Sequence, residues 1–236
     1  MKYRIGCSGY YYPQWKNKFY PKGVAPKNWL AHYSSVFNTV ELNGTFYRQP
    51  KLPDLKKYAS VTPDDFTFSV KMSRYITHVQ RFADRQTIID FQGRVLEGLG
   101  HKLQHFLFQT PANFKYSEEN LQQIIANVPH TSQSVVEFRD ISWWNESVLK
   151  AFTSASIVFC NVDFPKLESP IVSTSSHFYL RLHGSPVLFQ TPYTIPRLKK
   201  FHRLFPADAQ VITVYFNNTM TEAGFQNALQ LMKIIS

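Results

Sequence analysis

The sequence predicts an α/β fold, because short runs of β-branched and aromatic residues alternate with segments of helical periodicity along its whole length. Eight such runs occur in 236 residues, a length just under the ~250 residues typical of eight-stranded α/β barrels. No Gly-x-Gly-x-x-Gly follows the first run, which disfavours an open sheet that binds a dinucleotide. We therefore expect a single domain over residues 1–236 with the fold of a (β/α)8 TIM barrel.

The predicted strands recur from the N-terminus to residue 216, and each has the apolar character of a parallel strand that is buried on both faces. In order they are Tyr3–Cys7, Thr39–Leu42, Phe66–Val70, Phe106–Gln109, Val135–Phe138, Ile157–Asn161, Phe178–Leu182 and Val211–Phe216.

The segments between most of these strands show helical signals, namely apolar residues three and four apart and residues that cap helix N-termini. The stripes are Ile88, Val95, Leu96 and Leu99; Leu121, Ile124, Ile125 and Val128 after Ser117 as N-cap; Val148, Leu149 and Phe152 after Asn145 as cap; and Phe225, Ala228, Leu229 and Met232. Between Asp163 and His177, two prolines and a Ser/Thr cluster replace such a stripe. We therefore predict an irregular sixth crossover.

Composition supports a folded chain with no membrane anchor. At 44% hydrophobic and 16% aromatic residues, it can bury roughly 70–75% of its unfolded surface. It has no apolar run of ~18 residues and no apolar signal core at its start, so a cytoplasmic protein is expected. Cys7 and Cys160 lie in separate apolar runs and are predicted to be reduced core thiols. The net charge of +10 attracts polyanions and anionic metabolites without choosing among them.

Every predicted strand ends in polar residues, and wherever two occur they are two positions apart. Residues two apart share one face of a strand, and active sites of such barrels lie at the C-terminal strand ends. We therefore expect these residues to face inward together: Ser8 with Tyr10, Glu41 with Asn43, Lys71 with Ser73, Gln109, Glu137 with Arg139, Asn161 with Asp163, Arg181 with His183, and Tyr215 with Asn217. Burial of about a dozen polar groups costs several kcal/mol each unless they are paired, which favours a ligand or reaction site.

The charges of this inward set predict an anionic, phosphate-bearing substrate. Three cations stand against three carboxylates, and Arg48 and Arg74 in the loops after the second and third strands add positive charge at the rim. The residues predicted to bind substrate are Ser8, Asn43, Arg48, Ser73, Arg74, Gln109, Arg139, Arg181, Tyr215, Asn217 and Asn218. Nucleic acid is the alternative partner, and no feature indicates an oligomeric state.

Two kinds of chemistry fit the predicted catalytic residues Glu41, Lys71, Glu137, Asp163 and His183. A divalent metal ion could be held by the three acids and His183, although the sequence has no metal-binding motif and the arginines would compete for the carboxylates. Alternatively, Glu41 or Glu137 acts as general base, Lys71 stabilises negative charge and His183 shuttles a proton. An imine-forming role for Lys71 is disfavoured, because adjacent carboxylates would raise its pKa.

These patterns favour an enzyme with hydrolase-like or acid/base chemistry on a phosphate-containing substrate. The alternative is a non-catalytic binder of nucleic acid or of a small anion, which would show binding without turnover.

The strings at the strand ends also resemble a known family. They are Gly6-x-Ser8-Gly9, Val40-Glu41-Leu42-Asn43, Val70-Lys71 with Ser73-Arg74, Phe108-Gln109-x-Pro111, Val136-Glu137-Phe138-Arg139, Arg181-Leu182-His183-Gly184 and Tyr215-Phe216-Asn217-Asn218. Together they resemble the YecE-like proteins, called domain of unknown function 72. The resemblance implies a (β/α)8 barrel and no particular catalytic role. The chain departs from the family pattern at Cys7, Tyr10, Gly44, Asp140 and Thr219, which leaves the inward acids, bases and arginines untouched.

Overall fold

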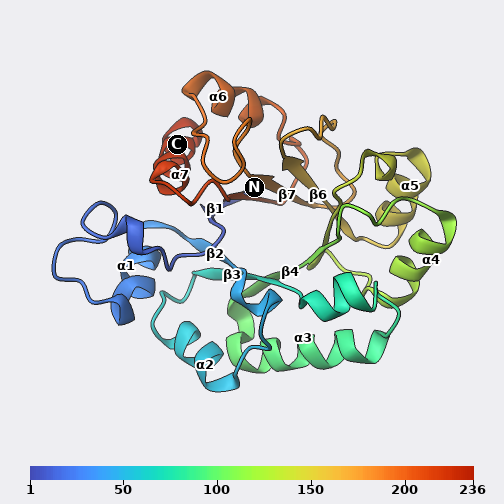
Figure 1. Ribbon diagram of the computed structural model, residues 1–236, viewed down its shortest axis with the longest axis horizontal. Coiled ribbons are helices and arrows are strands. Elements are labelled where there is room, and N and C mark those ends of the chain that lie inside the picture. Colours follow the sequence, from blue (N-terminus) through green and yellow to red (C-terminus); the bar gives the residue numbers. More distant parts are fainter.

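The computed structural model describes residues 1–236 and shows eight parallel strands that form a barrel surrounded by helices (Figure 1). The strand order β1-β8-β7-β6-β5-β4-β3-β2 runs once around the barrel, with every neighbouring pair parallel. The predicted (β/α)8 fold is therefore confirmed.

All eight predicted strands are present, with ends that differ from prediction by a few residues. They are β1 (Lys2–Cys7), β2 (Thr39–Leu42), β3 (Thr67–Lys71), β4 (Leu103–Gln109), β5 (Ser134–Glu137), β6 (Val158–Asp163), β7 (His177–Leu182) and β8 (Val211–Phe216). The helices are α1 (Trp29–Val36), α2 (Leu52–Ser60), α3 (Arg85–Leu99), α4 (Glu118–Asn127), α5 (Glu146–Ser154), α6 (Ile195–Arg203) and α7 (Ala223–Ile235).

Short helical turns occupy several of the connecting loops. They are η1 (Pro13–Trp15), η2 (Pro26–Asn28), η3 (Gly44–Phe46), the π-helical turn η4 (Tyr75–Val79), η5 (Gly100–Lys102) and η6 (Ile141–Trp143). None of the helices combines the length and the apolar character needed to span a bilayer.

Local sequence signals explain where individual helices begin. The Ser117 hydroxyl accepts a hydrogen bond from the Asn120 backbone N–H, and the Asn145 side chain accepts one from the Val148 N–H, so both predicted caps are present. No helix lies between β6 and β7, which confirms the irregular sixth crossover.

The seam between β1 and β2 closes the barrel mainly through side chains, one of which is Asn38, bonded to the backbone of Tyr3 and Ile5. Only one backbone bridge, between Ser8 and Glu41, joins the two strands. Beside it the buried Tyr33 hydroxyl of α1 accepts a hydrogen bond from the Cys7 N–H at 2.7 Å and donates one to the Thr39 carbonyl at 3.1 Å. A helix side chain thus replaces a rung of the β-ladder, and it fixes β1 and β2 close to each other.

The barrel interior contains a small apolar cluster that reveals which residues of each strand face inward. It comprises Leu107, Val135, Val158, Cys160, Val162, Tyr179 and Tyr215. On β6 the inward residues are therefore Cys160 and Val162, and the intervening Asn161 and Asp163 face the outer layer. The expectation that Asn161 and Asp163 point into the barrel is wrong by one position, and this changes the site described below.

At the N-terminal ends of the strands, the barrel interior is filled by hydrogen-bonded polar side chains. The Tyr215 hydroxyl donates to Ser69 Oγ at 3.0 Å and also bonds to Thr39. His105 Nε2 lies 3.0 Å from His177 Nδ1. Tyr215, predicted to bind substrate, is instead fully buried with its hydroxyl engaged by β2 and β3.

Candidate functional site

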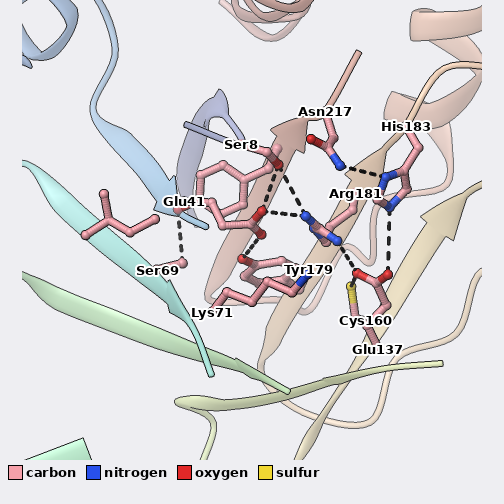
Figure 2. Close-up of polar contacts among 12 residues, drawn as sticks. Ser8, Glu41, Ser69, Lys71, Glu137, Cys160, Tyr179, Arg181, His183 and Asn217 are labelled. Carbon is pink, nitrogen blue, oxygen red and sulfur yellow. Dashed lines mark hydrogen bonds and ion pairs between the residues drawn. The ribbon is translucent and has the colours of Figure 1, made fainter. Parts of the chain in front are cut away.

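Arg181 of β7 lies at the centre of the polar cluster and bridges two acids from opposite sides of the barrel (Figure 2). Its Nη2 lies 2.6 Å from Glu41 Oε1, and its Nη1 lies 2.6 Å from Glu137 Oε2. All three side chains are buried, so one guanidinium group compensates two carboxylates. Burial would lower the pKa of Arg181, but Glu137 and Glu41 raise it well above its ordinary value.

Glu41 of β2 has its remaining acceptor positions filled by hydroxyl groups. Ser8 Oγ donates to Oε1 at 2.7 Å, and the Tyr179 hydroxyl donates to Oε2 at 2.8 Å. With Arg181, Glu41 thus accepts three hydrogen bonds, which fix the carboxylate in place. Tyr179 is not among the residues predicted for the site, although it lies two residues before Arg181 on the same strand face and the alternation could have identified it.

Glu137 of β5 is held as a carboxylate by two arginines. Burial would raise its pKa, but the guanidinium groups of Arg139 and Arg181 outweigh burial and lower it. Arg139 Nη2 forms an ion pair with Oε1, and the Cys160 thiol lies 3.8 Å from Oε2. A paired carboxylate with a lowered pKa is a weak general base, so the geometry disfavours this predicted role for Glu137.

His183, two residues beyond Arg181, is completely buried beside these charges. Its Nδ1 lies 2.9 Å from the side-chain amide of Asn217, and its Nε2 lies 3.8 Å from Glu137 Oε1 (Figure 2). The same Nε2 lies 3.3 Å from Arg139 Nη2. Burial, followed by the positive charges of Arg139, Arg181 and Lys71, lowers its pKa well below the ordinary value. The imidazole is therefore neutral near neutral pH, which disfavours the predicted proton-shuttle role.

Lys71 is the last residue of β3, and its ammonium group makes no hydrogen bond or ion pair with the rest of the chain. The Nζ atom lies 4.0 Å from the centre of the Phe46 ring. Burial, followed by the charge of Arg181, lowers its pKa to about 8, although Glu137 and Glu41 oppose this shift. The expectation of a raised pKa for Lys71 is therefore wrong: the carboxylates do raise it, but burial and the nearby guanidinium charges together outweigh them.

Arg139 follows β5 and has hydrogen-bond donors that no protein atom uses. Its guanidinium carbon lies 4.1 Å from the centre of the Phe164 ring, and its Nη2 pairs with Glu137. Its Nε and Nη1 are buried and lack a partner within the chain. Unpaired donors on a buried guanidinium group indicate a place where an anion can bind.

Asp163 does not belong to this cluster, contrary to the sequence prediction. Its carboxylate receives two hydrogen bonds from Arg197 Nη2, at 2.8 and 3.0 Å, and another from the Tyr193 hydroxyl. Asn161, on the same outer face, pairs with both backbone groups of Val172 in the sixth crossover. The partners of these two side chains lie in the β6–β7 connection, the β7–α6 connection and α6, outside the barrel.

The displacement of Asp163 changes both the metal hypothesis and the charge of the site. Of the predicted ligands Glu41, Glu137, Asp163 and His183, only Glu137 and His183 lie next to each other, with Oε1 3.8 Å from Nε2. No group of three or more His, Cys, Asp or Glu residues has the geometry to hold a metal ion. The inward set keeps Lys71, Arg139 and Arg181 against only two carboxylates. The mouth of the barrel therefore has a net positive charge instead of the predicted balance.

The other predicted binding residues are spread around the rim. Arg48, Ser73 and Arg74 line a cavity of about 580 Å³ beside η3 and η4. Ser8, Asn43 and Arg48 line a second cavity of about 690 Å³, together with Tyr10, Tyr11 and Tyr12. Gln109 is half-buried at the end of β4, where its amide donates to the Thr110 carbonyl.

Asn218 is structural in this arrangement, unlike its neighbour Asn217. Its side-chain amide donates to the Thr191 carbonyl at 3.1 Å and to the Asn227 side chain at 2.9 Å, and the residue is fully buried. These bonds connect the end of β8 to α7 and to the β7–α6 loop. The prediction that Asn218 binds substrate therefore receives no support from its position.

The two cysteines are free and fully buried, Cys7 in the outer core and Cys160 inside the barrel. Burial raises the pKa of both thiols, so neither forms the reactive thiolate near neutral pH. We expect no reaction of the native protein with Ellman's reagent at about pH 7.5, and two thiols per chain once denaturant is added. Fast reaction of one thiol in the native state would contradict this burial.

Comparisons with known proteins agree with this architecture. Residues 4–236 match the family described as "Protein of unknown function DUF72". The chain is 30% identical over 190 residues to the UPF0759 protein YunF of Bacillus subtilis, an alignment that covers 71% of this chain and 66% of that protein's length. Among solved structures, a DUF72 family protein from Thermotoga maritima superposes with a TM-score of 0.88 at 27% identity, covering 100% of this chain and 99% of that chain. A DUF72 family protein from Enterococcus faecalis shares the fold, with a TM-score of 0.84 at 19% identity over 99% of this chain and 95% of its own.

Proposed function

The chain belongs to the DUF72 family, and for this member we propose that the C-terminal mouth of the barrel binds a small anionic, phosphate-bearing substrate and performs acid/base chemistry on it. One observation carries the proposal, namely cations whose donors are unused within the chain. Lys71 Nζ makes no hydrogen bond or ion pair within the chain and lies over the Phe46 ring, Arg139 Nε and Nη1 have no partner, and the two carboxylates nearby are already paired. A phosphate or carboxylate group would supply the missing acceptors through charge-assisted hydrogen bonds.

Among the predicted acids and bases, Lys71 suits proton transfer best. A general acid or base works best when its pKa lies near the working pH, and that of Lys71 is lowered to about 8. The pKa values of Glu137 and His183 are both lowered away from neutrality, and Glu41 is fully engaged by its three donors. In hydrolysis of a phosphate ester, Lys71 would protonate the leaving oxygen while Arg139 holds the phosphate. Arg181 and the two glutamates would keep these groups in position.

A non-catalytic nucleic-acid binder is the second candidate, favoured by the net charge of +10 and by the tyrosine-lined cavity. Bases can stack on tyrosine rings while Arg48 contacts phosphates. Binding of this kind weakens steeply as salt is raised, whereas binding at a buried anion site is screened less. Salt titration with an oligonucleotide and with inorganic phosphate therefore separates the two candidates.

The proposal is tested by calorimetric titration of the protein with inorganic phosphate. We expect saturable binding that weakens by roughly 10–100-fold in Arg139→Gln, because a charge-assisted hydrogen bond contributes about 1.5–3 kcal/mol. Arg203→Gln removes the same charge from the exposed C-terminal end of α6, at the opposite end of the barrel, and should change the affinity by less than about twofold. Equal losses in both variants, or no saturable binding, would overturn the proposal.

A further inference from the structure

We propose that Lys71 is a nucleophilic amine that forms an imine with a small carbonyl compound bearing a phosphate or carboxylate group. The inference rests on the proposed anion site, which would hold the charged group of that compound, and it adds a reaction class that the site itself does not specify. Three features of the structure support it: the position of Lys71, the absence of partners for its amine, and the charges around it.

The position of Lys71 is that of a reacting group in this fold. It is the final residue of β3 and faces inward with Glu41 and Arg181 (Figure 2). Reacting groups of (β/α)8 barrels lie at the C-terminal ends of the strands. Two other inward side chains at this end, Arg181 and Arg139, are tied to carboxylates, whereas Lys71 is free to approach a substrate.

The lack of hydrogen-bond partners distinguishes the half-buried Lys71 from the buried Lys102. Lys102 Nζ donates to the Ala59 carbonyl at 2.7 Å, to the Thr62 carbonyl at 2.8 Å and to Thr62 Oγ1 at 3.3 Å. Those three acceptors hold Lys102 as an ammonium group. The amine of Lys71 has no such acceptor, so loss of its proton breaks no hydrogen bond within the chain.

The surroundings of Lys71 favour the neutral amine. Burial and the guanidinium groups of Arg181 and Arg139 disfavour a third positive charge, and they outweigh the attraction of Glu137 and Glu41. With a pKa of about 8, roughly a tenth of Lys71 is unprotonated at neutral pH, against less than about a thousandth of an ordinary lysine. The Phe46 ring, 4.0 Å away, covers one side of the amine, and its attraction for an ammonium ion offsets this only in part.

The reaction requires no group beyond the amine and the carbonyl compound. The Nζ lone pair attacks the carbonyl carbon and forms a C–N bond, and the carbonyl oxygen becomes the hydroxyl of a carbinolamine. The C–O bond then breaks, and the oxygen leaves as water with the two hydrogens that were on the amine nitrogen. The free Nε and Nη1 of Arg139 are available to hold the phosphate or carboxylate group while this occurs.

The test uses the full-length protein with glyoxylate as probe and cyanoborohydride as reductant near neutral pH. Hydride adds to the imine carbon and a proton to the nitrogen, which leaves a stable carboxymethyl group on the modified lysine. Peptide mass mapping then gives the initial rate at each lysine. We expect Lys71 to react at least about tenfold faster than exposed Lys51, because it has the larger unprotonated fraction. The hydrogen-bonded Lys102 should remain unmodified.

Further experiments test imine formation and anion binding independently of each other. Inorganic phosphate should slow modification of Lys71 but not of Lys51, and the neutral probe propionaldehyde should show a smaller preference for Lys71 than glyoxylate does. In Lys71→Arg, whose folding is checked by thermal unfolding, the fast phase should disappear. Phosphate binding with Lys71 no faster than Lys51 would overturn the imine and leave the proposed function standing. Fast modification of Lys71 that phosphate does not slow would support the amine and overturn the anion site.

Discussion

Replacement of Arg181 by methionine is expected to lower the free energy of unfolding by about 3–5 kcal/mol, the cost typical of removing one partner from a buried ion pair. Methionine is close to arginine in length but leaves the buried carboxylate of Glu41 without its ion-pair partner and that of Glu137 with Arg139 alone. Desolvated charges that lose a partner are unfavourable, since the interior offers no water to replace it. Urea unfolding, followed by far-ultraviolet circular dichroism, measures the change.

Arg197→Met is the matched control for this prediction, because it breaks an ion pair near the surface. The Arg197 side chain is 40% exposed and pairs with Asp163 at 2.8 Å. Exposed pairs contribute at most about 1 kcal/mol, so this variant should lose far less stability. Adding Glu41→Gln and Glu137→Gln to Arg181→Met should recover part of the loss, since neutral amides cost less to bury. Similar losses in the two single variants would show that Arg181 does not compensate buried charge.

This arrangement suggests why so much charge is buried in one place. Arg181 and the two glutamates satisfy one another, which leaves Lys71 and Arg139 with most of their donors free at the mouth of the barrel. An apolar plug of the same volume would often be as stable, so the ion pairs are better explained by the need to hold cations in fixed positions. We infer that Glu41, Glu137 and Arg181 position the groups that would meet a ligand.

Most of the fold could be predicted from the sequence because a buried parallel strand leaves a plain signal. Apolar runs at eight places, separated by helical stripes, are compatible with few architectures, and the missing stripe after Asp163 correctly located the irregular crossover. The seam between β1 and β2 could not be predicted in this way. It depends on the Tyr33 hydroxyl, whose two backbone partners are set by tertiary packing.

The prediction of which residues face inward was correct on strands whose outer face is covered by an apolar helix layer. The prediction was wrong on β6. The outer face of β6 has no following helix, so the sixth crossover and Arg197 supply polar partners for Asn161 and Asp163. Polar residues at alternate positions therefore marked the outside of this strand instead of the inside. The irregular sixth crossover, which was predicted from the sequence, is thus the reason why Asn161 and Asp163 were assigned to the wrong face of β6.

The electrostatics of the site were the least predictable part, because they depend on which charges pair. Formal charges alone gave a balanced site, but the outward position of Asp163 leaves an excess of positive charge at the mouth. The direction of the pKa shift of Lys71 follows from burial and from its distances to guanidinium groups and carboxylates. Those distances arise only when β2, β3, β5 and β7 are brought together.

The buried neutral histidines lead to the second large expected effect, a loss of stability in mild acid. Burial lowers the pKa of His105 and His183 well below the ordinary value, helped by His177 in the first case and by Arg139, Arg181 and Lys71 in the second. In the unfolded chain both side chains bind a proton near pH 6.5. Below about that pH the unfolded state therefore holds protons that the folded state does not, and stability falls as the pH falls.

The size of this effect follows from proton linkage. Each such histidine costs about 1.4 kcal/mol of stability per pH unit, so the two together should remove roughly 2–3 kcal/mol between about pH 6.5 and pH 5.5. The pKa values of the less buried His78 and His177 are also lowered by burial, so these two side chains add to the loss in the same direction. Above about pH 7 these histidines no longer make the free energy of unfolding depend on pH. The lowered pKa of Glu137 acts in the same direction but only below its unfolded value of about 4.5, outside this range. Urea unfolding at several pH values measures the slope directly.

Two variants assign the slope to particular histidines. His105→Gln should reduce the slope by about 1 kcal/mol per pH unit, whatever the variant costs in absolute stability, because one buried proton site is gone. His101→Gln alters a histidine whose side chain is 71% exposed and should leave the slope unchanged. If both variants keep the full pH dependence of the free energy of unfolding, His105 gains its proton in the folded state. The hydrogen-bonded side chains at the N-terminal ends of the strands would then have to tolerate a buried charge. Such a charge would lie next to His177 and Tyr179, where no carboxylate is within ion-pair distance to compensate it.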